Sequence, residues 1–267
     1  MTPLPWEIFV SAAPVVLVFI TAVWILSLLI QDASIMDIFW GPGFVIAATW
    51  YLLSSEGYEP RRVLIISLVM IWGFRLAGYL LLRSRGKPED PRYQTWRLQA
   101  GQSWWWQSYL KVFLLQGLIL WVLSLPLLAA LAVKEPAYFT WTDGLGALFW
   151  VIGFVVEAAG DWQLYRFKRE PENKGRVLDT GLWAYTRHPN YFGEALLWWG
   201  YGFISLSSGA YWLLFSPLLM TVLLLRVSGV TMLERRLRSE KPEYETYIRT
   251  TNAFFPRVRK RGRRGRS

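Results

Sequence analysis

The chain has 267 residues, of which 54% are hydrophobic and 17 are tryptophan, and its formal net charge at pH 7 is +10. Charged residues make up 18% of the chain, whereas a soluble domain usually has about a quarter. Several uninterrupted apolar stretches are long enough to cross a bilayer. The composition therefore excludes an ordinary soluble protein and indicates a polytopic integral membrane protein of the all-α class.

Two residue types are missing or nearly so. The chain has no cysteine and one histidine, which excludes disulfides, a thiol nucleophile and an iron–sulfur site. The same counts argue against a zinc site with the usual ligands, and we expect no metal. The basic surplus collects in 83–97, 166–187 and 235–266, as expected for loops on the cytoplasmic side of a membrane. We therefore expect the partner to be a lipid bilayer and not a nucleic acid.

Apolar runs between helix breakers predict seven membrane helices. Their expected ranges are 8–30, 36–53, 62–82, 109–132, 142–165, 190–208 and 211–230. The connections at 83–108 and 166–189 and the tail from 235 are basic, whereas those at 54–61 and 133–141 are not. This alternation predicts an outer N-terminus and a cytoplasmic C-terminus.

Nothing in the sequence suggests a second domain. We expect one seven-helix domain over 1–256, followed by a basic disordered tail over 257–267. The protein is expected to be a monomer in the bacterial inner membrane, or in the endoplasmic reticulum membrane if the organism is eukaryotic.

Ionisable residues occur inside the predicted spans, where each is costly and is by default a functional hypothesis. Arg75 lies within the third span, and Glu157 and Asp161 lie four residues apart on one face of the fifth. Glu194 lies one turn into the sixth span, and Asp32 and Asp37 bracket the start of the second. These positions predict a polar cavity that opens to the cytoplasm.

The stretch GLWAYTRHPNYFGE (181–194) holds the single histidine at the predicted start of a helix. Pro189 suits the first helical position, and the backbone N–H groups of 190–192 are then expected to attract anions. Basic and polar side chains gather around this helix end and along the third span, a pattern that suits a nucleotide. They are Arg75, Tyr79, Arg83, Arg85, Lys168, Arg176, Arg187, His188 and Asn190.

RVLDTGLWAYTRHPNYFGEALLWWGY, followed by PEYETYIRTTNAFFP, resembles the C-terminal signature of the membrane-embedded steroid 5-alpha-reductases in their bacterial branch. The match runs over 157–256, and QDASIMDIFWG and FRLAGYLLLRSRG extend it upstream. The resemblance implies seven helices, NADPH on the cytoplasmic side, and reduction of the carbon–carbon double bond of a 3-oxo-Δ4-steroid or similar enone. The residues that match the cofactor-binding pattern are Arg75, Tyr79, Arg85, Asp161, Lys168, Arg176, Asn190 and Glu194.

The resemblance also bears on the group that polarises the substrate carbonyl. Gln31 and Asp32 resemble the Gln-Glu pair that faces this carbonyl, and Asp37 is a competing candidate. Where the animal enzymes pair a tyrosine with that acid, this chain has Trp72, whose N–H cannot relay a proton. Tyr79 or a protonated Asp32 or Asp37 is therefore the expected acid, since a carboxyl in an apolar cavity can remain protonated.

Two other functions stay open from the sequence. One is an S-adenosylmethionine-dependent methyltransferase that acts on a lipid or prenyl-cysteine, although that cation does not require so many basic residues. Two adjacent glutamates near the C-terminus would favour it, and this chain has Glu234 followed by Arg235 instead. The other is a non-enzymatic sterol- or lipid-binding membrane protein.

Overall fold

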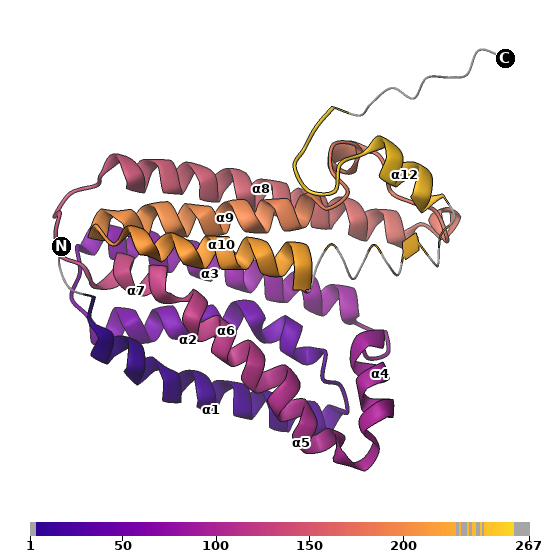
Figure 1. Ribbon diagram of the computed structural model, residues 1–267, viewed down its shortest axis with the longest axis horizontal. Helices are drawn as coiled ribbons and strands as arrows, with labels where there is room; N and C mark the ends of the chain where they lie inside the picture. Colours follow the sequence, from indigo (N-terminus) through magenta and orange to yellow (C-terminus); the bar gives the residue numbers. More distant parts are fainter. Residues whose placement is uncertain are drawn as a thin grey trace. The chain divides into compact units, whose positions relative to one another are not determined.

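The computed structural model describes residues 4–227, 230, 234, 237, 238, 241 and 243–258. All regular structure within these residues is helical, with no strand among them, which confirms the predicted all-α class (Figure 1). The helices are α1 (Trp6–Ile30), α2 (Ile35–Ser54), α3 (Glu59–Ser84), α4 (Pro91–Ala100), α5 (Trp104–Ser108), α6 (Leu115–Leu123), α7 (Leu125–Ala132), α8 (Trp141–Arg169), α9 (Pro189–Ser205), α10 (Phe215–Val222) and α12 (Tyr244–Thr250). Of the predicted tail over 257–267, residues 259–267 lie outside the described residues.

Within the residues that the structure describes, five helical segments are long and apolar enough to cross a membrane. They are Trp6–Ile30, Ile35–Ser54, Glu59–Ser84, Pro91–Ala132 and Trp141–Arg169, and each contains one of the first five predicted spans. The predicted sixth and seventh spans correspond to α9 and to the shorter apolar segment Tyr211–Arg226. A total of seven spans, and the orientation, remain predictions.

The connection between α9 and α10 is short and consists of two 3-10 turns. The 3-10 turns Leu206–Ser208 and Tyr211–Leu214 flank Gly209, whose φ of 77° lies in the left-handed region that favours glycine. The chain therefore reverses in a short helical hairpin. Residues 228 and 229 of the predicted seventh span lie outside the described residues.

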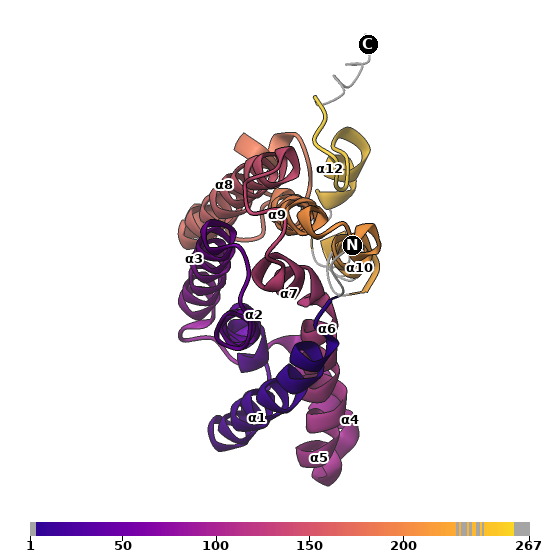
Figure 2. The ribbon, with the colours of Figure 1, turned by 90° about the vertical axis from the view of Figure 1, so that its left-hand side faces the viewer.

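The chain divides into two compact units, and no linker separates them. The first comprises the residues up to Gly144 together with Phe203–Ser216. In it α2 is the central helix, and it packs against α1, α3, α6 and α7 (Figure 2). A Cβ at Gly41 would lie 2.4 Å from the carbonyl oxygen of Gly73, so glycine at these positions allows the close approach of α2 and α3.

Exposed tryptophans lie toward both ends of α1 in the first unit. Trp6, at its start, stacks on Trp212 at a centroid distance of 5.8 Å, and both rings are exposed. Trp24, near its other end, donates from Nε1 to the carbonyl oxygen of Trp105, whose own ring is exposed. Such aromatic rings are typical of the two membrane–water interfaces. Helix α1 has 25 residues and is therefore about 37 Å long, enough to join them.

The second unit comprises Leu145–Gly202 and the chain from Pro217 onward. Its α8 and α9 run side by side in Figures 1 and 2. A Cβ at Gly193 would lie 2.4 Å from the backbone nitrogen of Glu157, and one at Gly153 would lie 2.5 Å from that of Leu197. Small residues at such a crossing let two helix backbones pack closely. This packing brings the acidic face of α8 against the first turns of α9.

We expect Gly193→Ala to destabilise the second unit by several kcal/mol, because the new methyl group meets backbone that cannot easily move. Gly144→Ala, near the start of α8, places its methyl in open space and should be neutral or slightly stabilising. Thermal unfolding in detergent, followed by circular dichroism, compares the two variants. Equal melting temperatures would contradict the close approach of α8 and α9.

Candidate functional site

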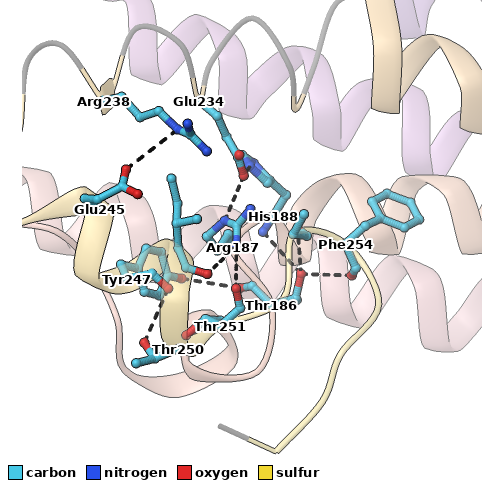
Figure 3. Close-up of polar contacts among 12 residues, drawn as sticks. Thr186, Arg187, His188, Glu234, Arg238, Glu245, Tyr247, Thr250, Thr251 and Phe254 are labelled. Carbon is cyan, nitrogen blue, oxygen red and sulfur yellow. Dashed lines mark hydrogen bonds and ion pairs between the residues drawn. The ribbon is translucent and has the colours of Figure 1, made fainter. Parts of the chain in front are cut away.

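The segment from Trp183 to His188 is tied to residues near the C-terminus (Figure 3). The backbone N–H of Arg187 donates to the carbonyl oxygen of Asn252 at 2.9 Å, and that of Arg257 donates to the carbonyl oxygen of Tyr185 at 2.9 Å. The Thr186 hydroxyl contacts the carbonyl oxygen of Phe254 at 2.8 Å. We call this segment, 183–188, the α9 entry loop, and residues 244–257 the C-terminal strap.

Arg187 is the side chain that joins the α9 entry loop to the C-terminal strap most extensively. Its Nε donates to Glu234 Oε1 at 2.8 Å, and its Nη1 donates to the carbonyl oxygens of Ile248 and Thr251. Arg187 is buried, and the side chain of Glu234 is 13% exposed. The guanidinium that we predicted for a nucleotide thus already has an acidic partner and two carbonyl partners, and its role toward a cofactor stays a prediction.

Glu234 also accepts a hydrogen bond from His188, whose Nε2 lies 3.1 Å from Oε1. Burial raises the pKa of the Glu234 carboxyl, but the hydrogen bonds from His188 and Arg187 and the Arg187 charge outweigh burial and lower it to about 2. Burial lowers the pKa of His188, and the nearby Glu234 opposes that shift only in part. At neutral pH the pair is therefore a carboxylate and a neutral imidazole.

Acidification should loosen the C-terminal strap in two steps. As the pH falls from 7.5 to 5.5, His188 takes up a proton more readily when the strap is released than when it is bound to the α9 entry loop, because burial lowers the pKa of His188. Binding of the strap to the loop therefore weakens. A second loss occurs as the pH falls below about 4.3, the ordinary value for a glutamate, toward the folded pKa of Glu234. Hydrogen exchange over 244–257, corrected for intrinsic rates, measures both steps. His188→Gln should abolish the first step, and stronger protection at pH 5.5 would contradict the assignment.

Asn190 and Asp161 are in contact where the start of α9 packs against α8. Asn190 Nδ2 lies 3.2 Å from Asp161 Oδ1, and Asp161 and Glu157 are both buried on one face of α8. Glu194, one turn further along α9, is half-buried. The structure thus brings Asp161 and Asn190 into contact, and their role toward a cofactor stays a prediction.

The start of α9 differs from the sequence expectation in one respect. The backbone N–H of Phe192 donates to the carbonyl oxygen of His188 at 3.0 Å, so it is not available to an anion. The backbone nitrogen of Asn190 faces Gly160 of α8, because a Cβ on that glycine would lie 3.2 Å away from it. The three free N–H groups that we expected at 190–192 are therefore not all free.

Two basic residues, at the end of α8 and shortly after it, are exposed. Lys168 lies in the last turn of α8, and Arg176 lies in the segment that follows. The carbonyl oxygen of Arg176 accepts a hydrogen bond from Lys241, which leaves its guanidinium at the surface. The role of both cations toward a ligand stays a prediction.

The predicted residues of α3 belong to the first unit. Arg75 and Tyr79 are half-buried, and the guanidinium of Arg83 lies 5.8 Å from the centre of the Tyr79 ring. Arg85 ends the helix and is exposed. Trp72 is completely buried and packs near Phe44, with a ring centroid distance of 5.7 Å.

The predicted acids of the first unit have partners near the start of α2. Asp32 Oδ1 accepts from the backbone N–H of Ser34 at 2.8 Å, an arrangement typical of a helix start. Asp37 accepts from the Tyr93 hydroxyl at 2.9 Å and from Arg92 Nη2 at 3.1 Å. Gln31 is exposed with a φ of 56°. Each acid is thus held by a neighbour, and the catalytic role of all three stays a prediction.

Sequence reasoning assigned no role to Glu234, Arg92 or Tyr93. A signal existed for Glu234, because it is the only acid between Arg226 and Arg238, and a lone acid in a basic stretch suggests an ion pair. Arg235, which follows it, lies outside the described residues. No spacing rule connects Asp37 to Tyr93, 56 residues away.

Comparisons with known proteins show similarity to a yeast protein and to a bovine enzyme. The chain is 28% identical over 266 residues to an uncharacterized protein of Schizosaccharomyces pombe, covering 88% of this chain and 76% of the yeast protein. It is 29% identical over 75 residues to the bovine 3-oxo-5-alpha-steroid 4-dehydrogenase 1, which covers 28% of this chain and 27% of the bovine enzyme. No solved structure matches.

The family model described as "Protein of unknown function (DUF1295)" matches residues 23–251. That range includes α2–α10, the α9 entry loop and all of α12. The partial match to the bovine enzyme is a weak similarity to the steroid 5-alpha-reductases. The chain therefore belongs to the DUF1295 family, a steroid 5-alpha-reductase-like family of membrane proteins.

Proposed function

We propose that this protein is an NADPH-dependent reductase of the carbon–carbon double bond of an enone, with a 3-oxo-Δ4-steroid as the model substrate. The observation that carries the proposal is the local similarity to 3-oxo-5-alpha-steroid 4-dehydrogenase 1 together with the Asp161–Asn190 contact in the second unit. The bilayer would supply an apolar substrate of this kind.

The polar atoms at the start of α9 fit part of a nucleotide. His188 Nδ1 and Asn190 Oδ1 are buried and have no hydrogen-bond partner among the described residues. Native proteins leave few buried polar atoms in this state, and a ligand would satisfy both. Lys168 and Arg176, exposed on the adjoining connection, could neutralise phosphate groups.

When bound, the nicotinamide supplies a hydride for the β-carbon of the enone. The chain's own part is to orient the two partners, to exclude water, and to stabilise the negative charge that develops on the carbonyl oxygen. Asp32, Asp37 and Tyr79 are the candidates for the group that donates to that oxygen. Glu157, Asp161, Asn190 and Glu194 would hold the cofactor.

Binding of NADPH to the detergent-purified protein tests the proposal. We expect NADPH to raise the melting temperature, and Asn190→Ala to weaken binding about tenfold, because a buried hydrogen bond is lost. Asn173→Ala is the matched control, since Asn173 lies in the same unit and bonds the carbonyl oxygen of Phe167 instead. A wild-type protein that binds NADPH should then oxidise it when an enone such as androst-4-ene-3,17-dione is added.

NADH and S-adenosylmethionine are the competing ligands in the same assay. Arginine and lysine side chains favour the extra 2′-phosphate of NADPH, so NADH should bind more weakly. A melting shift with S-adenosylmethionine and none with NADPH would refute the reductase and leave the methyltransferase as the better hypothesis.

A further inference from the structure

Two buried atoms at the start of α9 that have no hydrogen-bond partner among the described residues share the same hydrogen-bonding character. His188 is 1% exposed, and its Nε2 contacts an oxygen of Glu234 (Figure 3). A carboxylate only accepts hydrogen bonds, so Nε2 carries the imidazole proton. A neutral imidazole has one N–H, and Nδ1 is therefore an acceptor with a buried lone pair.

The same reasoning fixes the amide of Asn190. Its Nδ2 lies 3.2 Å from Asp161 Oδ1, and this contact is favourable only when the amide nitrogen faces the carboxylate. Oδ1 must then point elsewhere. It is buried, and no described residue donates to it. Both residues thus present a buried acceptor within three positions of one helix start.

We propose that the first turn of α9 is a recognition site for hydrogen-bond donors, in which His188 Nδ1 and Asn190 Oδ1 accept from hydroxyl or amide N–H groups of the ligand. Glu234 and Asp161 are positioning residues, because each fixes the direction in which its neighbour accepts. The proposal rests on the proposed function in that it names the part of the nucleotide that this turn binds.

Two acceptor atoms at this turn favour the donor groups of the ligand over its phosphate groups. Phosphate oxygens are acceptors, so they gain nothing from His188 Nδ1 or Asn190 Oδ1 and would be repelled by their lone pairs. In a nicotinamide dinucleotide the donors are the ribose hydroxyls, the carboxamide N–H groups and the adenine amino group. We therefore assign one of these neutral groups to the α9 turn, and the phosphates to exposed cations such as Lys168 and Arg176.

Because the chain has a single histidine, its tautomer can be read without assignment. In protein labelled with 15N-histidine, the two imidazole nitrogens should show a protonated Nε2 and an unprotonated Nδ1 at pH 7.5. Glu234→Gln should produce a mixture of tautomers, because a side-chain amide can either donate or accept. A protonated Nδ1, or an imidazolium, in the wild-type protein would overturn the proposal.

Ligands then test the acceptor role directly. NADPH should shift the Nδ1 resonance, whereas inorganic pyrophosphate should not. The acetylpyridine analogue of NADPH lacks the amide N–H groups, and 2′-phospho-ADP-ribose lacks the nicotinamide, so these two distinguish a carboxamide from a ribose hydroxyl. Asn190→Ala should weaken binding of the ligand that shifts the Nδ1 resonance by about five- to tenfold. Asn173→Ala should leave that affinity unchanged.

The outcomes separate this proposal from the reductase. If NADPH does not bind but S-adenosylmethionine shifts Nδ1, the reductase fails while the donor-recognition site stands, because that ligand also carries ribose hydroxyls. If pyrophosphate shifts Nδ1, or if NADPH binds and leaves Nδ1 unmoved, the donor-recognition site is wrong. The same conclusion holds if no member of the panel affects this nitrogen.

Discussion

Arg187→Ala should release the C-terminal strap from the α9 entry loop and raise hydrogen exchange over 244–257 by roughly two to three orders of magnitude. The substitution leaves the Glu234 carboxylate without its cation and removes the donor to the carbonyl oxygens of Ile248 and Thr251. Removing one partner of a buried ion pair typically costs about 3–5 kcal/mol. Trypsin should then cleave within the strap at concentrations that spare the wild-type protein.

Arg238→Ala is the control for that experiment. Arg238 also pairs with a glutamate, Glu245, but at 4.0 Å and with both side chains about half exposed. Such surface pairs contribute roughly 0–1 kcal/mol, so exchange over the strap should hardly change. If the two variants behave alike, the ion pair of Arg187 does not hold the strap. The measurement needs no ligand, so it separates this structural role from any role of Arg187 in binding a nucleotide.

Arg61→Ala should be the most destabilising single substitution in the first unit. Arg61 is 0% exposed, and its Nε and Nη2 donate to both carboxylate oxygens of Asp143 at 2.8 and 3.0 Å. Its Nη2 also donates to the carbonyl oxygen of Tyr138 at 2.9 Å. The Asp143 carboxylate that is left without a cation should lower the free energy of unfolding by about 3–5 kcal/mol. Thermal unfolding in detergent would show this as a large fall in melting temperature.

A double-mutant cycle with Asp143→Asn isolates the pair. The double variant should recover part of the loss, because it removes the uncompensated charge that each single variant leaves. Lys134→Ala is the matched control, since Lys134 and Glu56 also approach to 2.8 Å but both side chains are mostly exposed. A fall in melting temperature as large for Lys134→Ala as for Arg61→Ala would show that burial does not decide the value of these pairs.

The helices that span the membrane could be predicted because a long apolar run needs no distant partner. Helix α1, expected over 8–30, extends over Trp6–Ile30, and α8, expected over 142–165, extends over Trp141–Arg169. The sequence could not show that the fourth span continues N-terminally through α4 to Pro91. That extension is polar, and its Arg92 and Tyr93 are held by Asp37 of α2.

The candidate site was predictable as a set of residues and not as a set of contacts. Asp161 and Asn190 could be singled out because polar groups at the ends of apolar helices are costly. The partner of Arg187 could not, since the relevant acid lies 47 residues later in the chain and pairing at that separation follows from tertiary packing. The glycines that bring α8 against α9 carry a seven-residue spacing, Gly153 to Gly160 and Gly193 to Gly200, which is a usable signal for such a crossing.

The C-terminal strap also sets an order of events during synthesis. The carbonyl oxygen of Thr251 that receives the Arg187 guanidinium belongs to a residue made 64 positions later. At about 5–20 residues per second the ribosome needs on the order of several seconds to make that stretch. Throughout this interval the α9 entry loop has no strap to bind. The start of α9 is therefore among the last parts of the protein to mature.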